Sequence, residues 1–112
     1  MRMEERFSRT ALLLGEAGVE KLRKSRVAVF GLGGVGSWCA EALARAGVGT
    51  LALVDKDRVE ESNLNRQLVA LTSTVGRPKA EVMRERVLDI FPACNVQAHE
   101  LFYLPETAHL FP

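Results

Sequence analysis

Three short apolar segments stand out along the chain, and each is followed by a turn or a polar stretch. Residues 26–30 (RVAVF) and 50–54 (TLALV) are nearly uninterrupted apolar runs, which are typical of strands buried on both faces of a parallel sheet. Residues 95–101 form a third, more mixed segment. The pattern therefore predicts three strands.

Helical periodicity fills the intervals between these runs. Residues 35–46 predict a helix that ends at Gly47, and residues 78–91 predict another, with Pro78 in its first turn and Pro92 after its end. The apolar sides of these two helices are expected to be Val35, Cys39, Leu43 and Ala46 in the first, and Ala80, Met83, Val87 and Ile90 in the second. Residues 1–24 are also predicted to be helical, in two pieces divided at Gly15 and Gly18, and a short helix is expected over 105–110.

The order strand, helix, strand, loop, helix, strand predicts an α/β fold, a Rossmann-like parallel sheet with flanking helices. Three strands make the N-terminal half of a doubly wound domain, so we expect a truncated part of a longer protein. We expect residues 1–112 to be the N-terminal part of one domain, with residues 1–24 as a helical arm and residues 25–112 as a nucleotide-binding βαβ unit.

Composition narrows the class of protein only slightly. The formal net charge of +1 gives no support for a DNA or membrane partner, and neither is predicted. No apolar run approaches the ~20 residues of a membrane helix, and the charged start of the chain does not resemble a signal peptide, so we expect a cytoplasmic protein. Cys39 and Cys94 lack the spacing of a zinc site and are expected to be buried free thiols.

The first candidate for chemistry is a glycine-rich turn between the first strand and the first long helix. Residues 31–36 (GLGGVG) contain the pattern G-x-G-x-x-G, in which glycines let a phosphate approach the backbone at a helix N-terminus. Asp55, at the end of the second strand, is placed to accept hydrogen bonds from a ribose. These features fit an NAD(P)-dependent oxidoreductase as well as an ATP enzyme, and the glycines alone can also serve close packing.

The polar stretch 55–79 favours ATP. Asp57 is a second carboxylate, suited to a magnesium ion that also binds phosphates, and Lys79 is a positive charge suited to phosphate. Amide and guanidinium donors lie between them, at Asn63, Asn65, Arg66 and Gln67. A nicotinamide site needs neither a second acid nor such cations, whereas phosphate chemistry needs both. The alternative interpretation is an ordinary solvated loop.

Three motifs together carry a resemblance to a known family: GLGGVGS, then DKDRVEESNLNRQ, then VGRPK. They resemble the ubiquitin-activating-enzyme superfamily, which includes the adenylyltransferases of molybdopterin and thiamine biosynthesis and the threonylcarbamoyladenosine dehydratases. The segment RFSRTALLLGEAG near the N-terminus is most similar to the tRNA dehydratase branch. The resemblance covers nearly the whole chain.

The resemblance, together with the glycine turn, implies a set of site residues. ATP would contact Gly31, Gly33, Gly34, Gly36, Asp55, Ser62, Asn63, Leu64, Asn65, Arg66 and Lys79. Asp57 would help to hold magnesium. Arg9 matches an arginine that dimers of this family insert into the nucleotide site of the partner, which implies a homodimer; the alternative is a surface arginine. Arg9, Arg66 and Lys79 would act in catalysis by supplying positive charge.

The implied reaction is attack of a carboxylate on the α-phosphate of ATP, which gives an acyl-adenylate and pyrophosphate. In the dehydratase branch the carboxylate belongs to the threonylcarbamoyl group of a tRNA adenosine, which then cyclises with loss of AMP. The C-terminal glycine of a ubiquitin-like sulfur carrier is the alternative substrate, and a non-catalytic nucleotide-binding module is a third possibility. Family members have a further aspartate-rich segment beyond the stretch that matches residues 1–112, so we expect these residues alone to bind ATP weakly and not to turn over.

Overall fold

The fold is built on a parallel sheet of three strands. The computed structural model describes residues 4–101 and His109. Strands β1 (Arg26–Phe30), β2 (Thr50–Val54) and β3 (Asn95–His99) pair in the order β1-β2-β3, so β2 is central. The predicted α/β, Rossmann-like parallel sheet is confirmed, although the third strand is two residues shorter than expected. Apart from His109, the helix expected over 105–110 lies outside the described residues.

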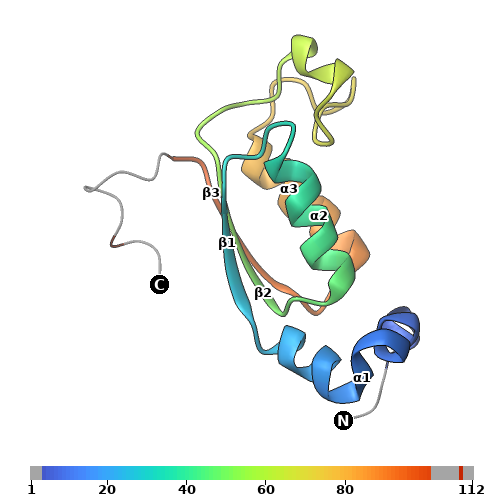
Figure 1. The fold of residues 1–112 in the computed structure, drawn as a ribbon. Helices are drawn as coiled ribbons and strands as arrows, with labels where there is room; N and C mark the ends of the chain where they lie inside the picture. Colours follow the sequence, from blue (N-terminus) through green and yellow to red (C-terminus); the bar gives the residue numbers. More distant parts are fainter. Residues whose placement is uncertain (1–3, 102–108, 110–112) are drawn as a thin grey trace.

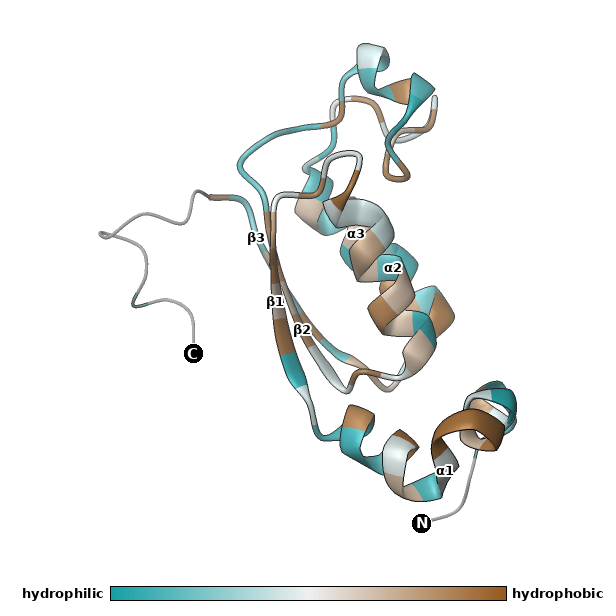
Figure 2. Ribbon diagram, viewed as in Figure 1, coloured by the Kyte–Doolittle hydropathy of each residue, from teal (hydrophilic) through white to brown (hydrophobic). Residues whose placement is uncertain are grey.

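Two helices cover one face of this sheet. Helices α2 (Gly36–Ala46) and α3 (Lys79–Ile90) lie side by side against it (Figure 1), each within a residue of its predicted bounds. The largest fully buried side chains of this layer include Leu32, Leu51, Leu53, Met83 and Val87. Figure 2 shows hydrophobic residues along β1 and β2 where the helices pack, so the main core lies between sheet and helices.

The buried side of α2 differs from the one expected. Its buried residues are Ser37, Ala40, Glu41 and Ala44. Val35, just before the helix, is 86% exposed, and Cys39 is exposed too. Small alanine and serine side chains let the helix backbone come close to the sheet, and this close approach outweighs the higher hydrophobicity of the other side. Of the two cysteines, only Cys94 is the buried thiol that was predicted.

Strand β1 was expected to be buried on both faces, and this is wrong for the described chain. Arg26, Ala28 and Phe30 are exposed on the face away from α2 and α3, and Phe30 is 49% exposed. No described element covers this face. The central strand β2 is buried from Leu51 to Val54, because it has a neighbour on each side.

The N-terminal segment forms a short 3₁₀ helix, η1 (Glu5–Phe7), followed by α1 (Ser8–Arg23). Helix α1 is kinked at Gly15, where φ is 75° and ψ is 166°. The predicted break at Gly15 is therefore confirmed, whereas the one at Gly18 is wrong, because Gly18 is helical. Phe7 is buried and packs edge-to-face on Phe91, with ring centroids 5.0 Å apart, which fixes the start of this segment on the end of α3.

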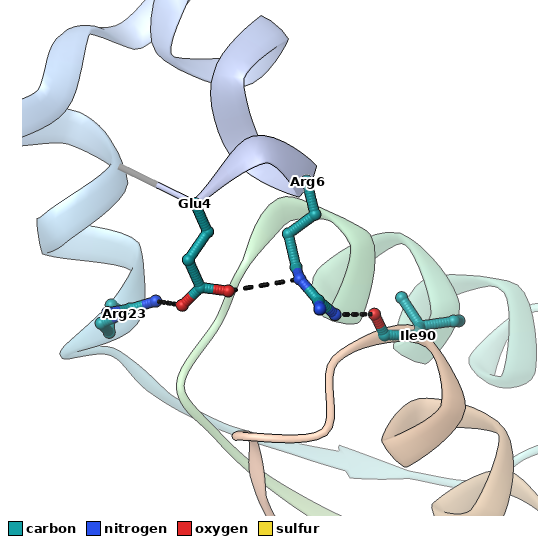
Figure 3. A network of polar contacts seen from close by, with 4 residues as sticks. All are labelled: Glu4, Arg6, Arg23 and Ile90. Carbon is teal, nitrogen blue, oxygen red and sulfur yellow. Dashed lines mark hydrogen bonds and ion pairs between the residues drawn. The ribbon is translucent and has the colours of Figure 1, made fainter. Parts of the chain in front are cut away.

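Polar contacts hold the same segment in place (Figure 3). Arg6 donates from Nη1 to the carbonyl oxygen of Ile90 at 2.9 Å, and Glu4 pairs with Arg6 at 3.2 Å and with Arg23. Helix α1 therefore lies at the end of the sheet where the strands begin, far from their carboxyl ends (Figure 1). None of the described helices is both long and apolar enough to cross a membrane.

A half-buried ion-pair cluster joins α2 to α3. Glu41 pairs with Arg86 of α3 and, at 3.4 Å, with Arg45 one turn along α2. The hydrogen bond from Arg86 lowers the pKa of Glu41 against the opposing effect of burial, and the charge of Arg45 lowers it further. Glu41 is thus kept ionised in a largely buried position, and the two helices share one charged contact.

Candidate nucleotide-binding site

The carboxylate of Asp55 connects the turn that follows β1 to the segment that follows β2 through hydrogen bonds. Asp55 follows β2 and is only 9% exposed. Its Oδ2 accepts a hydrogen bond of 2.6 Å from the amide of Leu32, and its Oδ1 accepts one of 2.7 Å from the amide of Asp57. Asp55 therefore fixes the glycine turn against the start of the 55–79 segment, and each of its oxygens still has a lone pair for a ligand.

The glycines of the turn fall into two groups. Gly31 has a φ of 90°, and a Cβ atom on Gly36 would lie 1.7 Å from the Gly31 carbonyl oxygen, so the fold itself requires both. A Cβ atom on Gly33 would make only an ordinary contact, and one on Gly34 would meet nothing within 4 Å. Packing within the described chain therefore does not explain Gly33 and Gly34.

The same turn presents unused backbone donors. Its hydrogen bonds use the amides of Gly31, Leu32 and Ser37. The amides of residues 33–35 have no partner among the described residues. Ser37, which is fully buried, donates from Oγ to the Gly33 carbonyl oxygen at 2.5 Å and holds the turn at the start of α2. Free amides at the N-terminus of a helix are suited to bind an anion.

The 55–79 segment contains a short 3₁₀ helix, η2 (Glu61–Asn65). Its N-terminus is capped by Asn63, whose Oδ1 accepts from the amide of Glu60 at 2.9 Å. Asn63 is buried, so its side-chain oxygen has a structural partner, while the other predicted contacts in this motif, Ser62, Leu64, Asn65 and Arg66, are exposed.

Arg66 is held by its own helix. Its Nη1 donates to Asn65 Oδ1 at 2.8 Å and to the carbonyl oxygen of Ser62 at 3.2 Å. Both contacts are exposed. They restrict the guanidinium group without neutralising it, since neither acceptor is charged.

Backbone pairing returns the chain to the strand ends. The amide of Val59 donates to the carbonyl oxygen of Arg77, and the amide of Gly76 donates to that of Val59, both at 2.8 Å. The amide of Lys79 donates to the carbonyl oxygen of Asp57 at 3.1 Å. Residues 22 positions apart in the sequence are thus neighbours, and Lys79 begins α3 beside the end of β2.

Lys79 is the most informative residue of the site. It is 7% exposed, and its ammonium group makes no hydrogen bond or ion pair with any described residue. Its Nζ is absent from the buried side-chain nitrogens and oxygens that lack a hydrogen-bond partner, so the ammonium group reaches the surface while the rest of the side chain is buried. An anionic ligand beside Lys79 would pair with this positive charge.

A hollow of about 320 Å³ lies at this end of the sheet. It is lined by Phe30, Gly31, Val54, Asp55, Lys56, Asp57 and Leu101. Ligands of open α/β sheets bind outside the carboxyl ends of the strands, and this hollow has that position. A larger one, of about 480 Å³, lies at the far end of α3 between Phe7, Arg86 and Ile90, and contains none of the predicted site residues.

Asp57 fits a magnesium ion only as one ligand among several. Its side chain is 54% exposed and pairs with Lys56 at 3.2 Å. The described residues contain no group of three carboxylate, histidine or cysteine side chains that would hold a metal by themselves. Magnesium commonly binds one or two carboxylates together with phosphates and water, and a single exposed aspartate is compatible with that.

Arg9 is not brought to this site within the chain. It is exposed on α1, at the opposite end of the sheet. Two contacts of the site were missed from the sequence, namely the backbone amide of Leu32 on Asp55 and Ser37 on Gly33. The only available signal was a hydroxyl residue directly after the glycine motif.

The sequence pattern of the ThiF family matches residues 7–111. The chain belongs to the ThiF family. The resemblance inferred from the three motifs is therefore confirmed.

Several ThiF-family relatives and structures are similar to the chain. The tRNA threonylcarbamoyladenosine dehydratase of Bacillus subtilis (strain 168) is 55% identical over 109 residues, which cover 97% of this chain and 43% of the relative. The crystal structure of Escherichia coli tRNA N6-threonylcarbamoyladenosine dehydratase in complex with ATP matches with a TM-score of 0.92 and 42% identity, over 98% of this chain and 47% of that one. The probable adenylyltransferase/sulfurtransferase MoeZ of Mycobacterium tuberculosis (strain CDC 1551 / Oshkosh) is 43% identical over 92% of this chain and 27% of the relative. The chain thus spans less than half the length of each of these proteins.

Proposed function

We propose that the intact protein is an ATP-dependent enzyme that adenylates a carboxylate, and that residues 1–112 supply much of its nucleotide site. The observation that carries this proposal is the unpaired ammonium group of Lys79, held on a largely buried side chain at the same end of the sheet as the unused amides of residues 33–35. A cation and a row of amide donors are both suited to bind an anion. The similarity to an ATP complex supports a nucleotide as that anion.

Each residue of the site would have a separate role in binding the nucleotide. The amides at Gly33 and Gly34 would bind phosphate oxygens, and the oxygens of Asp55 would accept from the ribose hydroxyls. Lys79 and Arg66 would neutralise the phosphates, so that an anionic carboxylate can attack the α-phosphorus while pyrophosphate leaves. Magnesium, when bound at Asp57, would supply further positive charge.

We further propose that the carboxylate is the threonylcarbamoyl group of a tRNA adenosine, which cyclises with loss of AMP once activated. The support is the similarity to proteins named tRNA threonylcarbamoyladenosine dehydratase in B. subtilis and E. coli. Such a substrate would place the enzyme in the cytoplasm. The 43% identity to MoeZ favours a second candidate, activation of a ubiquitin-like sulfur carrier at its C-terminal glycine.

ATP–pyrophosphate exchange by the intact protein tests these alternatives. We expect exchange to be stimulated by tRNA that carries threonylcarbamoyladenosine, and not by the same tRNA without the modification. Stimulation by a sulfur carrier instead would select the second candidate. If calorimetry detects binding of NADH but not of ATP with magnesium, the adenylation proposal is wrong and an oxidoreductase takes its place.

A homodimer in which Arg9 enters the nucleotide site of the partner is also part of the proposal. It fits an exposed Arg9 that lies far from the site of its own chain. Mixing Arg9→Ala and Lys79→Met subunits, each inactive alone, should restore about a quarter of the sites, because half of the randomly formed dimers are mixed and each has one complete site. No recovery in dimers shown to exchange subunits would refute a role for Arg9 in the partner's site.

A further inference from the structure

Gln67 lies directly beside the glycine turn. A Cβ atom built on Gly33 would be 3.6 Å from Nε2 of Gln67, so the carboxamide occupies the space next to that glycine. The backbone of Gln67 is fixed, because its amide donates to the carbonyl oxygen of Asn63 and its carbonyl oxygen accepts from the amide of Ala70, both at 3.0 Å. The side chain thus links the 55–79 segment to the phosphate-binding turn.

The two polar atoms of this carboxamide differ in burial. Oε1 is buried and has no hydrogen-bond partner; among the buried side-chain nitrogens and oxygens of the described residues, it alone lacks one. Nε2 also makes no hydrogen bond with a described residue, and since it is absent from that buried class, it retains access to the surface. The oxygen therefore points inward, and the amino group is available beside Gly33.

An unpaired buried acceptor destabilises the fold by about 1–3 kcal/mol. A methionine at this position would fill similar space without that cost, so internal packing does not explain the glutamine. The accessible group is a donor, and it lies next to backbone donors that also lack a partner. A ligand that accepts several hydrogen bonds at once would satisfy all of them.

Given the nucleotide site proposed above, we propose that Gln67 binds a phosphate oxygen of the nucleotide through its side-chain amino group. It would act with the amides of Gly33 and Gly34 from the other side of the turn. A carboxylate at this position would repel the phosphate and would bury a charged oxygen where Oε1 now lies. A neutral amide is therefore the side chain of this shape that suits the site.

The test compares Gln67→Met with Gln67→Glu in the intact protein, and measures binding of ATP, AMP and adenosine by calorimetry together with the melting temperature without ligand. Gln97→Met is the matched control, because Gln97 is an exposed glutamine on β3 that lies outside the site. We expect Gln67→Met to weaken ATP binding about tenfold or more, as for a lost hydrogen bond to a charged group. Gln67→Glu should weaken it further, and adenosine binding should not change in either variant.

The melting temperature separates ligand binding from a packing role. Gln67→Met removes the unpaired oxygen, so its melting temperature should equal or exceed that of the wild type while ATP affinity falls. Unchanged ATP affinity in both variants, or equal weakening of ATP and adenosine binding, would overturn the inference. Failure of the wild-type protein to bind ATP would instead refute the proposed function itself.

Discussion

Two glycines of the turn, two residues apart, should respond in opposite ways to the same added methyl group. In Gly36→Ala the new Cβ atom would lie 1.7 Å from the carbonyl oxygen of Gly31 and 2.8 Å from the carbonyl carbon. Both are backbone atoms, which cannot rotate away as a flexible side chain could. In Gly34→Ala it would meet nothing within 4 Å, and φ at Gly34 is not positive. The structure therefore predicts a folding defect in the first variant and a binding defect in the second.

The magnitudes follow from these contacts. Overpacking of this severity costs about 3 kcal/mol or more, a large part of the roughly 5–15 kcal/mol that stabilises a typical domain. Replacing glycine by alanine at a permitted φ stabilises by ~0.4–1 kcal/mol, because the unfolded chain loses freedom. Gly36→Ala should thus unfold at clearly lower denaturant concentration, and Gly34→Ala at the same or a slightly higher one.

Calorimetry with ATP and magnesium then separates the two effects. A methyl group at Gly34 would occupy the space needed by a phosphate, so ATP binding by the stable Gly34→Ala variant should fall at least tenfold. Wild-type affinity in Gly34→Ala would refute the idea that a nucleotide fills the open space beside this glycine. Wild-type stability in Gly36→Ala would show that the close approach to Gly31 does not limit the fold.

Three further predictions concern single side chains. Lys79→Met should leave the melting temperature about unchanged, because methionine fills the buried part of the side chain and the lost ammonium group has no partner among the described residues, while ATP binding is lost; a large fall in melting temperature would mean that Lys79 has a structural partner. Glu41→Gln should destabilise by ~1 kcal/mol at pH 7, a value reduced for the partial exposure of Arg86. Because the folded pKa of Glu41 lies below 4.5, the wild-type advantage is complete above pH 4.5 and should disappear as the pH falls through the lowered pKa; an advantage that persists in acid would contradict the ion pair. Phe7→Ala should cost ~3 kcal/mol by removing a buried ring from Phe91, and denaturation of Phe7→Leu provides the milder control.

The sequence predicted those parts of the fold that depend on local pattern. Strands β1 and β2 have the predicted bounds, because each apolar run ends at a glycine or an aspartate. The buried side of α2 was not predictable from hydrophobicity, since Ala40 and Ala44 pack inward through their small size while Val35 remains exposed. The uncovered face of β1 was also missed, because an apolar run does not reveal which faces are covered.

The candidate site was likewise predicted only where local sequence pattern determines it. The glycine turn and Asp55 were found from the sequence because they are adjacent to strand ends and follow a known spacing. The approach of Lys79 to Asp57 depends on pairing between Val59 and Arg77, which leaves no periodic signal in the sequence. The unpaired state of Lys79 and the inward oxygen of Gln67 depend on three-dimensional burial, and only the structure gives them.

The way in which the 55–79 segment is fastened has a consequence for how such proteins can diverge. The contacts that hold Lys79 beside the end of β2 run between main-chain atoms of Asp57, Val59, Gly76, Arg77 and Lys79. Main-chain hydrogen bonds depend little on which side chains the residues between them carry. Exposed positions such as Leu71 and Val75 can therefore change during evolution, and with them the surface offered to an acceptor molecule, while the lysine stays where it is. In this way the proposed nucleotide site can be kept while the substrate that it activates changes.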